Sequence, residues 1–172
     1  LAEEVMRVYG YDHIIGTKMT GPVMRGRRMF GRDKDDKMKA VLVAAGLQEI
    51  TTYSFINPSS IEPLNLPQND GRRQMIPILN PLGEEYSVLR TQLLTGMLTV
   101  LGTNYTRKIP AVRFFERGKR FVAKQLPIIE QPNEIPVLCL GAFGKEESFF
   151  TLKGVLEALF ARFGVKADYA VS

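Results

Sequence analysis

The order of helix-type and strand-type segments along the chain is the feature that most restricts its fold. Amphipathic helical segments at residues 33–45, 91–105 and 151–163 are separated by strand-like segments, and the two kinds follow each other without regular alternation. Hydrophobic residues make up 45% of the chain, which is enough to build a core. The sequence therefore predicts an α+β fold in which helices pack on one face of an antiparallel sheet.

The three helical segments are predicted from apolar residues that recur every three or four positions. Aspartates favour the start of the first segment, and Gly46 favours its end. Gly96 and Gly102 weaken the second segment, each by roughly 1 kcal/mol relative to alanine. The expected apolar stripes are Met38, Val41, Leu42 and Ala45; Leu94, Met97, Leu98, Leu101 and Tyr105; and Leu152, Val155, Leu156, Leu159, Phe160 and Phe163.

Strands are predicted where β-branched and aromatic residues gather between turn signals. The segment 111–123 reads as two strands or as one bent strand around Gly118, and 135–143 is apolar on both faces and therefore central. Pro77 marks the predicted strand 74–79 as an edge strand. The remaining expected elements are a helix end at 1–9, a linker at 10–32, strands at 47–56, 74–79 and 165–171, and a short helix at 59–64.

Composition excludes several kinds of active site. With His13 and Cys139 as the sole histidine and cysteine, the chain has no zinc site built from these residues and no internal disulfide. We expect Cys139, in an apolar run, to be a buried and inert thiol. Neither glycine-rich phosphate-binding pattern is present. The residues alone indicate no catalytic constellation, no membrane span and no signal peptide, and the chain begins within a helix, as a piece of a longer protein would.

The basic excess of the chain is concentrated in residues 105–125. This segment holds seven basic residues against Glu116 alone, with aromatic residues between them. Cations beside aromatic rings suit RNA, so Arg117, Lys119 and Arg120 are candidate RNA contacts. The alternative is an ordinary strand pair with apolar residues inward and solvated cations outward.

Five segments, in order, resemble the β subunit of bacterial phenylalanine–tRNA ligases. Residues 79–94 (LNPLGEEYSVLRTQLL) resemble its LNPLSEEYSVLRTSLL stretch, and residues 112–121 (VRFFERGKRF) resemble VRLFEIGRVF. The other three segments are residues 1–11, 47–55 and 149–159, which are similar to LIEEVARVYGY, LGFQEVITYSF and DFFDLKGDVEALL.

The resemblance implies a class II aminoacyl-tRNA synthetase-like fold that is catalytically silent. It implies that residues 1–15 end a preceding domain, that 16–32 form a linker, and that 33–172 are a synthetase-like domain truncated at its C-terminus. Active class II enzymes carry Phe-Arg-x-Glu where this chain has Phe121-Val122-Ala123-Lys124. In those enzymes the arginine contacts the ATP phosphate. Because this chain has Val122 there, it lacks the positive charge that would stabilise the reacting phosphate. No catalytic residue is therefore expected.

The resemblance also implies partners and cofactors for the intact enzyme. That enzyme is a cytoplasmic α2β2 ligase that joins phenylalanine to tRNA(Phe) with ATP and Mg²⁺, and its catalytic residues lie on the α subunit. Tyr53 and Phe55 become candidate anchors at the α interface, the alternative being that they fill this domain's own core. Glu3 and Glu4 match two ligands of a magnesium site in the intact subunit, but two glutamates are too few to hold the ion here. No cofactor is therefore expected in this chain.

Two other functions remain open from the sequence. One is a self-sufficient class II synthetase core, which Val122 disfavours. The other is a free-standing RNA-binding module that uses residues 105–125.

Overall fold

The computed structural model describes residues 1–27 and 30–169, and the chain divides into two compact units, residues 1–30 and 31–172. The first unit contains helix α1 (Ala2–Tyr9) and a 3₁₀ turn at Tyr11–His13. Residues 14–27 carry no helix or strand. The predicted helix at residues 1–9 is therefore confirmed.

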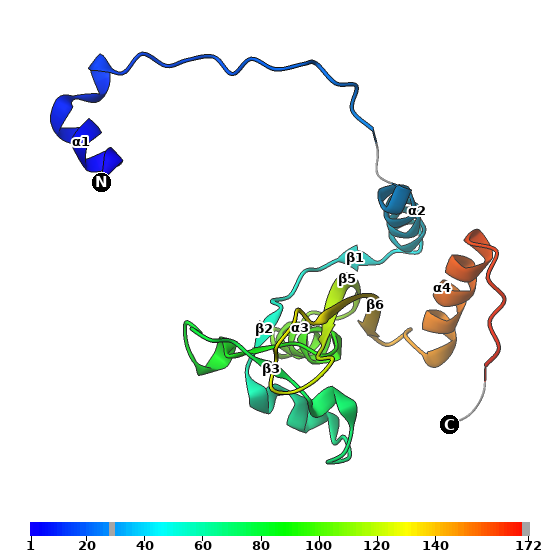
Figure 1. The fold of residues 1–172 in the computed structure, drawn as a ribbon. Coiled ribbons are helices and arrows are strands. Elements are labelled where there is room, and N and C mark those ends of the chain that lie inside the picture. The colour runs from blue at the N-terminus through cyan, green and yellow to red at the C-terminus, as the bar shows by residue number, and fades with distance from the viewer. Residues whose placement is uncertain (28–29, 170–172) are drawn as a thin grey trace. The chain divides into compact units, whose positions relative to one another are not determined.

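The second unit contains two small sheets (Figure 1). In the larger sheet, β1 (Gln48–Glu49) pairs in parallel with β5 (Val112–Val122), and β5 pairs in antiparallel fashion with β6 (Asn133–Phe143). In the smaller sheet, β4 (Val88–Leu89) lies between β2 (Phe55–Ile56) and β3 (Ile76–Pro77), and both pairings are antiparallel. Pro77 thus lies on an edge strand, as predicted.

The core lies where α2 (Phe30–Ala44) and α4 (Phe149–Arg162) cover one face of the larger sheet. It consists of five buried residues from these elements and from the connection between α2 and β1: Leu42, Leu47, Phe115, Val155 and Leu159. Helix α3 (Leu94–Thr106) packs on the opposite face, where Met97 and Leu101 approach Gly141 on β6. Helices therefore cover both faces, and the expectation of one covered face is wrong.

Local sequence signals set the ends of the helices. Ser148 caps α4, since its side chain accepts a hydrogen bond from the N–H of Thr151 while the Thr151 hydroxyl accepts one from the N–H of Ser148. Gly164 follows α4 with φ at +67°, a conformation that favours glycine. Helix α2 begins at Phe30, earlier than the predicted Asp33.

Three strand predictions need correction. The expected strand 47–56 is split into β1 and β2, which belong to different sheets, because Thr52 between them hydrogen-bonds to the side chain of Glu116 instead of to a neighbouring strand. The segment 135–143 was expected to be a central strand, but β6 lies at an edge of the larger sheet and β5 lies at its centre. Among the described residues, no strand pairs with the other side of β6. Residues 165–169 form no strand, and the rest of the expected strand lies outside the described residues.

Other expectations hold only in part. Segment 111–123 is one strand, and strand β4 was not predicted. On α3, Met97 is fully buried, but Leu94, Leu98 and Tyr105 are 42%, 46% and 68% exposed, because only a narrow stripe of the helix meets the sheet.

Cys139 is half-buried, and burial, followed by the charge of Glu116, raises the pKa of its thiol. Among the described residues, no helix is long and apolar enough to cross a membrane.

Candidate partner-binding groove

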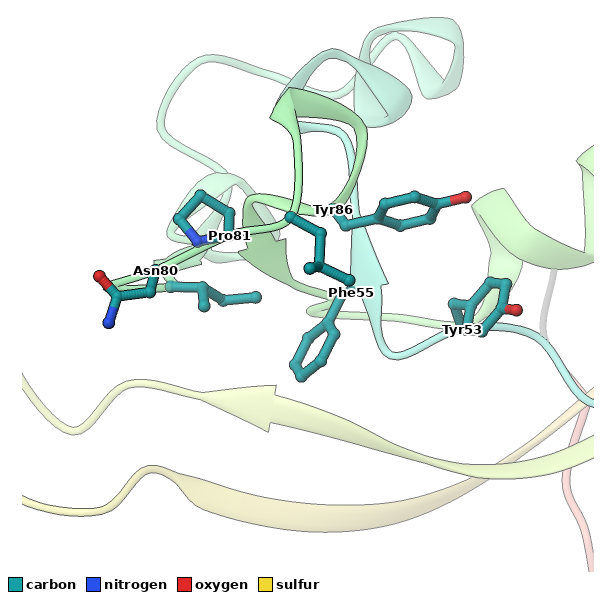
Figure 2. Close-up of a pocket in the computed structure, with 7 residues that line it drawn as sticks. Tyr53, Phe55, Asn80, Pro81 and Tyr86 are labelled. Carbon is teal, nitrogen blue, oxygen red and sulfur yellow. The ribbon is translucent and has the colours of Figure 1, made fainter. Parts of the chain in front are cut away.

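An apolar groove opens beside the smaller sheet (Figure 2). Its volume is about 240 Å³. The labelled side chains run from Asn80 and Pro81 at one end, past Phe55, to Tyr53 at the other. The groove is lined by Tyr53, Phe55, Ile78, Asn80, Pro81, Leu82 and Tyr86. None of these side chains carries a charge, so a ligand would be held there mainly by burial of hydrocarbon surface.

The large side chains of the groove are exposed to solvent. Tyr53 is 75% exposed, Phe55 48% and Leu82 fully exposed. The alternative that Tyr53 and Phe55 fill this domain's own core is therefore wrong. Contiguous exposed apolar side chains are typical of surfaces that bind another protein or a ligand. The sequence indicated Tyr53 and Phe55 but missed the other lining residues, because residues 78, 80–82 and 86 reach the groove only through the pairing of β3 with β4.

Two features fix the aromatic side chains in place. Phe55 lies on β2, where it pairs with Leu89 of β4. Tyr53 and Tyr86 form an edge-to-face contact, with ring centroids 5.7 Å apart and an angle of 71° between the rings. Such a contact contributes about 1 kcal/mol beyond simple burial. The groove therefore has a defined shape before any partner binds.

A buried ion pair lies beneath the segment that carries Tyr53. Arg90, 5% exposed, donates from Nη1 to Oε1 of Glu116, 1% exposed, over 2.9 Å. Arg90 also donates from Nε to the carbonyl of Lys119 over 2.9 Å. A buried charge is costly unless it is paired and hydrogen-bonded, and these contacts meet that need.

Thr52 connects this ion pair to the groove. Its N–H donates to Glu116 Oε1 over 3.1 Å, and its hydroxyl donates to Oε2 over 2.8 Å. Arg90 Nη1 donates to the Thr52 carbonyl over 3.2 Å, and the N–H of Arg90 donates to the carbonyl of Ser54 over 2.9 Å. The chain on both sides of Tyr53 is thus held by Arg90 and Glu116. We call Thr52, Arg90 and Glu116 the anchoring triad.

Sequence reasoning missed the anchoring triad. Arg90 and Glu116 both lie in segments that resemble the β subunit, but nothing in their spacing placed them together, since they are 26 positions apart. One signal was available. Glu116 is the single acidic residue in a strongly basic strand segment, which is unusual for a residue that serves only solubility.

The three candidate RNA contacts do not share a face. Arg117 pairs with Asp35 over 2.9 Å, and Lys119 pairs with Glu134 over 2.5 Å. Arg120 lines a cavity that neither Arg117 nor Lys119 lines, because neighbouring side chains on a strand point in opposite directions. These ion pairs compete with phosphate for two of the cations. An RNA role for Arg117, Lys119 and Arg120 stays a prediction.

The candidate magnesium ligands lie on α1, in the first unit. Glu4 accepts a salt bridge from Arg7 over 3.0 Å, and Glu3 is its sequence neighbour. Within the described residues, no three His, Cys, Asp or Glu side chains form a group that could hold a metal ion. Because Mg²⁺ requires about six oxygen ligands, these residues do not fit the ion by themselves.

Val122, which the resemblance places at the class II arginine, ends strand β5 and pairs with Asn133. The side chain of Lys124, which the resemblance places at the class II glutamate, forms a salt bridge with Glu130 over 2.7 Å. This end of β5 therefore carries a hydrocarbon side chain and is followed by an ion-paired cation, and the absence of the class II catalytic groups stays a prediction.

Comparison with known proteins identifies the family. Residues 14–172 match the family described as the phenylalanyl tRNA synthetase beta chain CLM domain. The phenylalanine–tRNA ligase β subunit of Clostridium tetani is 34% identical over 170 residues, covering 98% of this chain and 21% of that protein. The corresponding subunit of Moorella thermoacetica is also 34% identical, covering 96% of this chain and 22% of its own length. This chain spans about a fifth of the length of these relatives.

Solved structures support the fold. A pyrrolysyl-tRNA synthetase from Desulfitobacterium hafniense superimposes with a TM-score of 0.63 at 16% identity, covering 96% of this chain and 53% of that one. The predicted class II synthetase-like α+β fold is thus confirmed. The chain belongs to the CLM-domain family of phenylalanyl-tRNA synthetase β chains.

Proposed function

We propose that this chain acts as a non-catalytic interface unit within a phenylalanine–tRNA ligase β subunit, and that its apolar groove contacts the catalytic α subunit. The observation that carries the proposal is the exposure of Tyr53 and Phe55 on a groove lined by uncharged side chains. Aromatic residues of this kind are enriched at the centres of protein interfaces.

The anchoring triad supports the same role. It holds residues 52–54 by hydrogen bonds from buried groups, so the Tyr53 side chain is presented on a rigid segment. A groove that is already formed loses less entropy on binding than a flexible loop does. This favours a stable subunit interface.

The proposal extends to the whole enzyme. Such an α2β2 assembly would join phenylalanine to tRNA(Phe) with ATP and Mg²⁺ in the cytoplasm, with the catalytic residues on α. In this chain, residues 1–15 would end the preceding domain, 16–32 would be the linker, and 33–172 would be the interface domain. Glu3 and Glu4 would contribute to a magnesium site only together with ligands from elsewhere in the β subunit.

The interface proposal predicts that truncation of the two aromatic side chains weakens association with the cognate α subunit. The variant Tyr53→Ala with Phe55→Ala should raise the Kd for α by at least about tenfold, because central aromatic anchors dominate interface energies. Sedimentation velocity of the chain with and without separately expressed α, at moderate salt, measures this change.

A matched control separates loss of contact from loss of fold. Tyr105 is 68% exposed on α3 and lies outside the groove, so Tyr105→Ala should leave the Kd for α unchanged. Circular dichroism should show that all variants keep the native helix content. Equal binding of α by the double variant and by the unaltered chain would refute the interface role of the groove.

A further inference from the structure

A second cavity, of about 400 Å³, lies beside the C-terminal end of β5 and shares no lining residue with the groove. Its volume is in the range of small-molecule sites. Its polar wall includes Arg72, Gln74, Thr91 and Arg120, and its apolar wall includes Phe121 and Ile135. Apolar walls with a few convergent polar groups are typical of sites that bind small molecules.

Arg120 is the unusual member of this wall. Its Nε atom is buried and has no hydrogen-bond partner, and among the described residues no carboxylate pairs with its guanidinium. A buried donor without a partner costs about as much as a lost hydrogen bond. The neighbouring cations on β5 do have partners, since Arg117 pairs with Asp35 and Lys119 pairs with Glu134.

The one carboxylate on the wall does not neutralise Arg120. Asp70 accepts hydrogen bonds from the Nε and Nη2 atoms of Arg72, over 2.9 and 2.7 Å, and from the N–H of Arg72 over 2.8 Å. These bonds lower the pKa of Asp70 to about 2, so it stays ionised and bound to Arg72. Thr91 in turn donates its hydroxyl to the carbonyl of Arg72 over 2.5 Å, which fixes this loop against the cavity.

We propose that this cavity binds a small molecule that carries an oxyanion, either a phosphate or a carboxylate, and that the guanidinium of Arg120 holds this oxyanion. A guanidinium offers parallel N–H donors that match both kinds of oxyanion. Gln74 supplies a further amide donor, and Phe121 and Ile135 contact the apolar part of the ligand. A small ligand fits better than an RNA strand, because Arg117 and Lys119 do not extend the positive charge of Arg120 along one face.

The test is NMR of the arginine Nε–Hε groups in the full chain. Sodium pyrophosphate and sodium malonate are titrated separately at constant ionic strength, with sodium chloride as the reference. We expect at least one of the two anions to shift the Arg120 signal in a saturable way, and which anion acts identifies the chemical source. Saturation by neither anion would overturn the proposal.

Variants localise the effect. Arg120→Gln should weaken binding of the active anion by at least about tenfold, and Arg120→Lys should weaken it through loss of the two-pronged geometry. Arg107→Gln, at an exposed position outside the cavity, should leave the affinity unchanged. If Arg120→Gln does not fold, Arg120→Lys carries the test. Unchanged affinity in a folded Arg120 variant would refute the assignment.

A single-stranded RNA that shifts the Arg120 signal at lower concentration than pyrophosphate would also overturn the small-molecule assignment. None of these results depends on the α subunit. Failure of the groove proposal and failure of this one are therefore distinguishable.

Discussion

Replacement of Glu116 by alanine should destabilise the chain by about 3–5 kcal/mol, the usual cost of breaking a buried ion pair on one side. Glu116 is 1% exposed and accepts hydrogen bonds from Arg90 and from both the N–H and the hydroxyl of Thr52. Its removal leaves the Arg90 charge buried and without its carboxylate. Urea denaturation followed by circular dichroism measures the change in the free energy of unfolding.

Two control variants make this prediction specific. Glu134→Ala breaks the exposed pair with Lys119, in which Glu134 is 51% exposed, and should cost at most about 1 kcal/mol. Arg90→Met combined with Glu116→Leu removes both charges and should recover part of the lost stability. If Glu116→Ala costs no more than Glu134→Ala, the anchoring triad does not hold the groove as described.

Two glycines of the same helix should respond to alanine with opposite signs. A Cβ at Gly96 would lie 2.5 Å from Oγ1 and 3.0 Å from Cβ of Thr52, which Glu116 and Arg90 hold in place. Gly96→Ala should therefore destabilise the chain by about 1–3 kcal/mol, as overpacking does. A Cβ at Gly102 meets nothing within 4 Å, so Gly102→Ala should stabilise it by up to about 1 kcal/mol.

Thermal and urea unfolding of the two variants, side by side, measure these effects. The comparison is controlled internally because both positions lie in α3 and gain the same helix propensity. A stabilising Gly96→Ala would mean that Thr52 moves aside at little cost. The segment beneath Tyr53 would then be flexible, and the anchoring triad would not hold it rigidly.

The sequence predicted most of the elements that local patterns specify. Helices α2, α3 and α4 follow from their apolar periodicity, and Pro77 correctly marked an edge strand. The fold class followed from the mixed order of the elements and from the resemblance to a known family. These features depend on residues that are close together in the chain.

Features that depend on distant pairing could not be predicted in this way. The apolar pattern of 135–143 indicated a central strand, yet β6 lies at an edge of the larger sheet and is covered by α3 on one face and by core residues on the other. The groove forms only once β3 and β4 pair, and the anchoring triad joins three segments that are far apart in sequence. Local patterns carry no information on such contacts.

The most direct measurement of the interface role is site-specific photo-crosslinking in the full-length β subunit assembled with α. A photoreactive phenylalanine analogue replaces Tyr53 in one sample and Tyr105 in another, and products are identified by mass spectrometry. We expect an adduct between position 53 and the α subunit, and none from position 105. An assembled complex in which position 53 gives no adduct with α would contradict the interface role of the groove.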